Sequence, residues 1–160
     1  MSPRTIIRIL VALVARAGWA PALVFVLHVL VSRGLNAYVL FPPLDIPMHF
    51  FGGVVMAYFL SRCCAAVPEG VVARAARPWI EAVVVVGLTA TASVCWEFVE
   101  FIFDSALGTR VQLGPEDTLL DMFLGITGGV CWVLLAHGQG RLGAVDPLET
   151  RGLAQEEKVG

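Results

Sequence analysis

Four runs of apolar residues, separated by short stretches rich in charge, glycine or proline, dominate the chain. They cover about residues 19–40, 47–66, 79–104 and 117–137. Each is close to the length of roughly 20 residues that an α-helix needs to cross a bilayer. The pattern predicts an all-α membrane protein, a four-transmembrane-helix bundle with short loops that forms one helical domain over residues 1–137.

Both ends of the chain depart from this pattern. Three arginines interrupt or flank the apolar run at residues 6–15, namely Arg4, Arg8 and Arg16. Such a segment is typical of an N-terminal interfacial helix or of the cytoplasmic start of a long first helix. A cleaved signal peptide, with a cleavage site at residues 15–17, is the alternative. Residues 138–160 are polar and rich in glycine, and are predicted to be a disordered cytoplasmic tail.

Composition supports the membrane class and excludes several others. Hydrophobic residues make up 58% of the chain, charged residues 15%, and the mean hydropathy is +0.80, whereas soluble domains are about 45–50% apolar and about 25% charged. A net charge of −2 without a basic stripe argues against a nucleic-acid partner. The four cysteines lack the spacing of a metal site and are interpreted as apolar packing residues. Membrane lipids are therefore the expected partners, and a homo-oligomer is left open.

The distribution of basic residues predicts the orientation. Arginine and lysine near the ends of spans are retained on the cytoplasmic side. If both termini lie inside, nine basic residues fall on the inner segments and two, Arg33 and Arg110, on the outer side. The sequence therefore predicts a multi-pass protein of a bacterial inner membrane with both termini in the cytoplasm.

Seven ionisable residues gather at the outer ends of three predicted spans: Asp45, His49, Glu97, Glu100, Asp104, Asp117 and Asp121. Within each span they are three, four or seven positions apart, so they share one helical face. At about 1.5 Å per residue, Glu97 lies roughly 10 Å deeper than Asp104. An unpaired carboxylate at such depth costs about 2.5–3.5 kcal/mol, so partners, protons or a cation are expected.

Small residues extend two of these polar faces. Asp121 is followed on its face by Gly125 and Gly129, and His49 by Gly52 and Gly53. Faces of small residues are where helices approach one another in lipid. The acids are therefore expected to point into the bundle.

The strongest site hypothesis is a divalent cation held by Glu97, Glu100, Asp121 and His49. Three further residues are expected to be ligands or to hold the ligands in place: Asp45, Asp104 and Asp117. Oxygen ligands with one imidazole suit Mg²⁺, Mn²⁺, Fe²⁺ or Zn²⁺. The absence of a Glu-x-x-His motif argues against a di-iron bundle site. A bound metal activates water, which predicts a metal-dependent hydrolase of lipid or cell-envelope substrates with Glu97, Glu100 and Asp121 as catalytic residues.

Other interpretations compete with this one. Asp45 and Asp117 stand where carboxylates cap helix N-termini, and Asp104 is at a span end. Arg33 or Arg110 could neutralise a buried acid and form a structural latch. His28 is expected to make a hydrogen bond between helices. A structural or accessory protein, and a component of a cation or proton pathway, are the alternative functions.

Three segments carry a family resemblance: LDIPMHFFGG, WEFVEFIFD and EDTLLDMFLGITGG. Over residues 45–131 the chain resembles the small bacterial inner-membrane proteins of the YjdF-like group and, more distantly, the VanZ-like family. It is shorter than the YjdF-like proteins, which have more spans. The resemblance implies a membrane domain of undetermined activity, and VanZ-like members are linked to altered sensitivity to glycopeptide antibiotics. It does not supply a reaction.

Overall fold

The computed structural model describes residues 7, 11, 14, 15, 17–31, 35, 37–67, 71–108 and 112–144, and these contain helices and no strand. The elements are α2 (Trp19–Val29), α3 (Ala37–Leu40), the 3-10 turn η2 (Pro42–Leu44), α4 (Asp45–Ala65), α5 (Arg77–Leu107) and α6 (Pro115–Gly138). The all-α prediction is confirmed for this part of the chain. Arg4, Arg8 and Arg16 of the proposed interfacial helix, and Arg33 and Arg110 of the proposed latch, lie outside the described residues.

Three of the described helical segments are long and apolar enough to cross a membrane: Pro42–Ala65, Arg77–Leu107 and Pro115–Gly138. Their outward faces carry large exposed apolar side chains such as Val83, Phe98 and Leu134. The first predicted run, 19–40, contains the shorter apolar helix α2 and the four-residue α3, with Leu35 in a bend between them.

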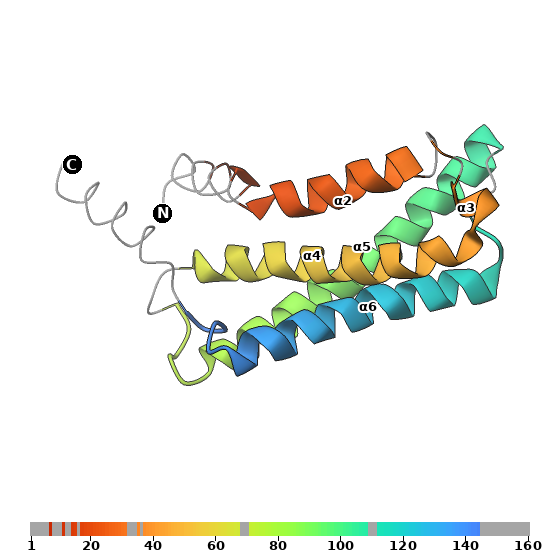
Figure 1. Cartoon of the computed structure of the whole chain (residues 1–160). Coiled ribbons are helices and arrows are strands. Elements are labelled where there is room, and N and C mark those ends of the chain that lie inside the picture. Colours follow the sequence, from red (N-terminus) through yellow and green to blue (C-terminus); the bar gives the residue numbers. More distant parts are fainter. Residues whose placement is uncertain are drawn as a thin grey trace.

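The helices lie roughly side by side, and α4 is at the centre of the packing (Figure 1). It contacts α6 most extensively and also packs on α2 and α5, while α5 packs on α6. Glycine makes the α4–α6 approach possible, because a Cβ at Gly53 would collide with the backbone of Gly125. A Cβ at Gly128 would likewise collide with the Phe50 carbonyl oxygen. The close pairing of small-residue faces in these two helices agrees with the sequence prediction.

A buried pair of charged residues organises the end of the bundle where α5 begins. Arg77 donates hydrogen bonds to the carbonyl oxygens of Cys64 and Val67, at 3.1 and 2.6 Å. One turn further along α5, Glu81 accepts a hydrogen bond of 2.7 Å from the Gly143 amide. Residues 139–144, part of the segment predicted to be a disordered tail, therefore pack against the bundle, with Leu142 buried in its core. Residues 145–160 are not among those described.

Candidate metal centre

The site is at the end of the bundle where α4 and α6 begin and α5 ends (Figure 1). Successive long helices run in opposite directions, so the start of one lies beside the end of the preceding one. The seven ionisable residues singled out in the sequence consequently lie at one end of the molecule. Three of their carboxylates, on Glu97, Glu100 and Asp121, are buried, as expected for side chains that point into the bundle.

His49 lies at the centre of this group of side chains. Its imidazole, 9% exposed, projects from the second turn of α4 between three carboxylates. The ring atom Nε2 lies 3.4 Å from Asp45 Oδ1 and 3.8 Å from Asp121 Oδ2. The other ring nitrogen, Nδ1, lies 3.9 Å from Glu97 Oε1. One imidazole thus links side chains from α4, α5 and α6.

Two overlapping groups of possible metal ligands share this histidine. The first is Asp45, His49 and Asp121, and the second is His49, Glu97 and Glu100; within each, the ligand atoms all lie within 4.8 Å of one another. We call the five residues together the His49 cluster. The predicted set of Glu97, Glu100, Asp121 and His49 therefore does not form a single group. Glu97 and Asp121 approach different nitrogens of the ring, and Asp45 is on the Asp121 side.

Two neighbours hold the glutamates in place. Trp96, one turn before Glu100 on α5, donates its indole N–H to Glu100 Oε1 at 2.8 Å. Gln112 donates its side-chain amide to Glu97 Oε2 at 3.2 Å and to the Glu97 carbonyl oxygen at 3.0 Å. The sequence did not predict the role of Gln112. No local pattern distinguishes a loop glutamine that folds back onto the preceding helix from one that faces solvent.

The remaining two acids, Asp104 and Asp117, accept hydrogen bonds from the loop between α5 and α6 and are not part of the cluster. Asp104 Oδ2 accepts the backbone N–H of Gln112 at 3.0 Å, and Asp117 Oδ2 accepts that of Leu113 at 3.1 Å. Neither belongs to a group of possible ligands among the described residues. The expected cap by Asp45 is also not observed, since the start of α4 has no side-chain cap and Asp45 faces His49.

Two polar atoms inside the cluster have no hydrogen-bond partner among the described residues. They are Nε2 of His49 and Oε1 of Glu97, and both are buried. Buried polar atoms almost always find a partner. Two such atoms on neighbouring side chains, with the carboxylates of Asp45 and Asp121 within 4 Å of Nε2, are the arrangement expected of a site that takes up a cation.

The family described as "Predicted membrane protein (DUF2238)" matches residues 6–141. The chain belongs to this family. The match includes all three long apolar helices and the whole His49 cluster. This DUF2238 member is accordingly a polytopic membrane protein with a buried grouping of histidine and acids. No curated protein and no solved structure matches the chain.

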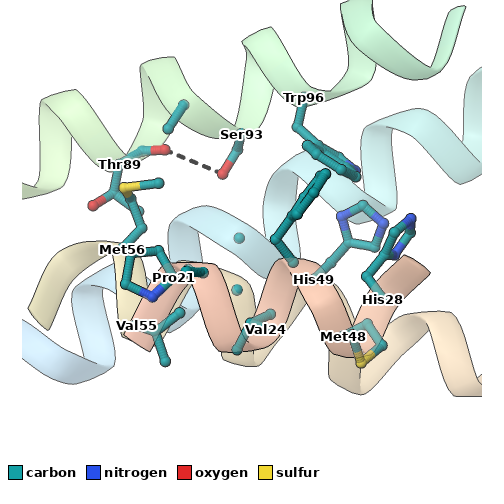
Figure 2. A pocket seen from close by; sticks show the side chains of 16 residues that line it. Pro21, Val24, His28, Met48, His49, Val55, Met56, Thr89, Ser93 and Trp96 are labelled. Carbon is teal, nitrogen blue, oxygen red and sulfur yellow. Dashed lines mark hydrogen bonds between the residues drawn. The ribbon is translucent and has the colours of Figure 1, made fainter. Parts of the chain in front are cut away.

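A cavity of about 390 Å³ adjoins the cluster, between α2, α4 and α5 (Figure 2). Its walls are mainly apolar, and His49 is one of the residues that line it. His28 and Trp96 are at the same end as His49, with their rings edge to face and their centroids 5.1 Å apart. The predicted hydrogen bond of His28 is present, between its Nδ1 and the hydroxyl of Tyr38 at 3.1 Å. Sequence reasoning did not anticipate the cavity.

The Tyr38 hydroxyl is a neutral component at this end of the site. Its oxygen lies 3.1 Å from Nδ1 of His28, whose ring lines the cavity. A phenol carries one O–H, so Tyr38 can serve as a hydrogen-bond donor here.

Proposed function

We propose that this DUF2238 member binds one divalent cation at the His49 cluster and uses it to hydrolyse a lipid or cell-envelope substrate. The ligands are His49 Nε2, Asp45 and Asp121. This set of two carboxylates and one imidazole is compatible with Mg²⁺, Mn²⁺, Fe²⁺ or Zn²⁺. Three protein ligands leave coordination positions for water and substrate, as catalytic sites require.

The two unpartnered atoms carry the proposal. A cation on His49 Nε2 requires the imidazole to be neutral, with its proton on Nδ1. Nδ1 lies 3.9 Å from Glu97 Oε1, the other buried atom without a hydrogen-bond partner. Metal-binding histidines regularly donate their second N–H to a carboxylate. One bound ion would therefore explain why both buried atoms lack a hydrogen-bond partner. It would bind Nε2, and the Nδ1–H would then point toward Glu97.

The glutamates are the proposed proton carriers. A metal-bound water has a lowered pKa and becomes a nucleophile. A cation held by His49, Asp45 and Asp121 would supply a water nucleophile for attack on phosphorus or a carbonyl carbon, and Glu100 or Glu97 would accept the proton of that water. The carboxyl group then returns the proton to the departing oxygen. The YjdF-like and VanZ-like resemblance, with the link of VanZ-like members to glycopeptide sensitivity, favours an envelope substrate.

Metal analysis tests this directly. Protein purified in a mild detergent is expected to carry close to one divalent ion per chain, and Asp121→Asn less than about 0.2, because an amide is a much weaker ligand. In wild-type protein first stripped of metal with a chelator, added metal at 100 times its Kd should raise stability by about 2.7 kcal/mol. The matched control is Asp117→Asn, one turn earlier on α6, whose carboxylate binds the Leu113 amide instead of the cluster.

The outcome also separates the alternative functions. The cluster would have a structural role if the wild type contains no metal and if Mg²⁺, Mn²⁺, Fe²⁺ and Zn²⁺ all fail to raise its melting temperature. A proton pathway requires relay groups across the bundle, yet α5 has no acidic or basic side chain between Glu81 and Glu97. If metal-loaded protein cleaves no lipid in vesicles of total membrane extract, the hydrolase assignment is wrong and the cation site alone stands.

We further propose that α2 belongs to a first span, giving four in total, with both termini in the cytoplasm of a bacterium. Labelling of single cysteines in intact cells tests this orientation. Leu113→Cys should react with a membrane-impermeant maleimide and Val71→Cys should not, although both positions are exposed. The native cysteines are first replaced by serine: Cys63, Cys64, Cys95 and Cys131. The reverse labelling pattern would place the His49 cluster on the cytoplasmic side.

A further inference from the structure

The cavity between α2, α4 and α5 is created by the absence of side chains. Gly52 of α4 and Ala92 and Ser93 of α5 line it, where larger residues would fill the space. A Cβ added at Gly52 would meet no atom within 4 Å, whereas its neighbour Gly53 is pressed against α6. The two glycines thus have different roles: Gly53 permits helix packing, and Gly52 leaves a volume empty.

The position of α2 keeps this volume open. Helix α2 packs mainly on α4. Towards α5, Phe25 meets Trp96 edge to face, with ring centroids 6.0 Å apart, and His28 meets the same ring at 5.1 Å. These aromatic contacts lie at the His49 end (Figure 2). Away from them, the wall is formed by aliphatic side chains and Pro21, Met56 and Thr89.

The cavity and the His49 cluster adjoin each other at His49. His49 contributes its imidazole to both, and Trp96 lines the cavity while its indole N–H holds Glu100. A molecule in the cavity therefore has an apolar environment along most of its length and the His49 imidazole and the Trp96 indole at one end. The carboxylates of the cluster lie behind His49 and do not line the cavity. At about 390 Å³ the space falls within the roughly 300–1,000 Å³ typical of small-molecule sites.

We propose that this cavity binds one acyl chain of a glycerophospholipid, with the lipid headgroup at the His49 cluster. The cavity lies among helices long and apolar enough to cross a bilayer, so acyl chains are the apolar molecules that surround it at high concentration. Ala22 and Phe25, which line the cavity, are themselves exposed on the α2 side, which gives a chain a route in from the bilayer. The assignment of the headgroup as substrate rests on the proposed function, whereas binding of the chain does not.

Photo-crosslinking tests the acyl-chain site. Wild-type protein is reconstituted in vesicles of phosphatidylethanolamine and phosphatidylglycerol that contain a phosphatidylglycerol with a diazirine in one acyl chain. Crosslinks are expected on cavity-lining residues of α2 and α5, and native mass spectrometry should show one retained phospholipid. Gly52→Leu should reduce both signals about tenfold, equivalent to about 1.4 kcal/mol, because the new side chain occupies the cavity. Ala92→Leu fills it from α5 and should act similarly.

The matched control is Gly87→Leu. Gly87 is also a helical glycine at which an added Cβ would meet nothing within 4 Å, but it does not line the cavity. Its crosslinking and retained lipid should equal those of the wild type. If Gly52→Leu and Ala92→Leu fold with wild-type melting temperatures and keep the lipid, the acyl-chain site is wrong. Recovery of a polyprenyl phosphate in place of a glycerophospholipid would also overturn it.

Metal content measured on the same samples separates this inference from the proposed function. Gly52→Leu is expected to lose the lipid and keep the divalent ion, and Asp121→Asn to lose the ion and keep the lipid. A wild type that binds metal but no phospholipid would overturn the acyl-chain site and leave the cation site intact. A wild type that retains phospholipid in the cavity without metal would support the acyl-chain site and contradict the cation site.

Discussion

Replacing His49 with leucine is expected to lower the free energy of unfolding by about 3–5 kcal/mol, the range seen when one partner of a buried ion pair is removed. His49 is the ion-pair partner that the described residues provide for both Glu97 and Asp121. In the metal-free protein, where a protonated His49 is their counter-charge, its removal leaves two buried carboxylates without a neutralising group at membrane depth, where water cannot solvate them. Equilibrium unfolding in bicelles measures the change, and the variant should also fail to bind a divalent ion.

The matched control is His137→Leu, at the opposite end of the bundle, where the residue is exposed and its ring lies tilted against Trp79 with centroids 5.8 Å apart. Its effect should be within about 0.5 kcal/mol, as for most surface substitutions. Adding Asp121→Asn and Glu97→Gln to His49→Leu should recover much of the lost stability, because neutral amides need no counter-charge, while metal binding stays lost. If the triple variant is no more stable than His49→Leu, charge is not the reason for the loss.

The second large effect is expected at the contact between α4 and α6. Gly53→Ala should destabilise the protein by about 3 kcal/mol, at the upper end of the usual cost of overpacking. The added Cβ meets the backbone of Gly125, which cannot turn aside as a side chain would. The helices must separate, and because His49 and Asp121 are on opposite sides of this contact, metal affinity should fall as well. Unfolding and metal titration of one preparation test both effects.

The adjacent glycine is the control for that substitution. Gly52→Ala introduces the same methyl group one position earlier on α4, where nothing lies within 4 Å. Its stability should be unchanged or higher by up to about 1 kcal/mol, since alanine favours a helix more than glycine does. Equal losses in the two variants would show that the effect comes from helix propensity or local backbone strain, and not from the α4–α6 contact.

Much of the site follows from helical periodicity. The three-, four- and seven-residue spacings place the acids of each helix on one face. Alternating direction then brings the end of α5 beside the beginnings of α4 and α6. The glycines that follow Asp121 predicted an inward face, and the burial of Asp121, Glu97 and Glu100 confirms it. These conclusions do not depend on the paths of the loops, because the hydropathy and the helical period of each segment can be read from that segment alone.

The hydrogen-bond partners of Asp104 and Asp117 could not be predicted from helical periodicity. They share a face with Glu97 and Asp121, yet they bind backbone amides of Gln112 and Leu113. The path of a loop depends on the separation and rotation of the helices it joins, and a sequence does not state either. For the same reason the role of Gln112 was missed.

The sequence by itself determined the membrane class, the helical fold and the gathering of acids with one histidine at a single end, because hydropathy and helical period are local properties. The tertiary structure decided which acid meets which nitrogen of His49. It also decided that Gly53 packs against α6 while Gly52 lines a cavity, and that α2 encloses this cavity together with α4 and α5. These features depend on the rotation and depth of each helix relative to its neighbours. Close packing across the whole bundle sets those two quantities.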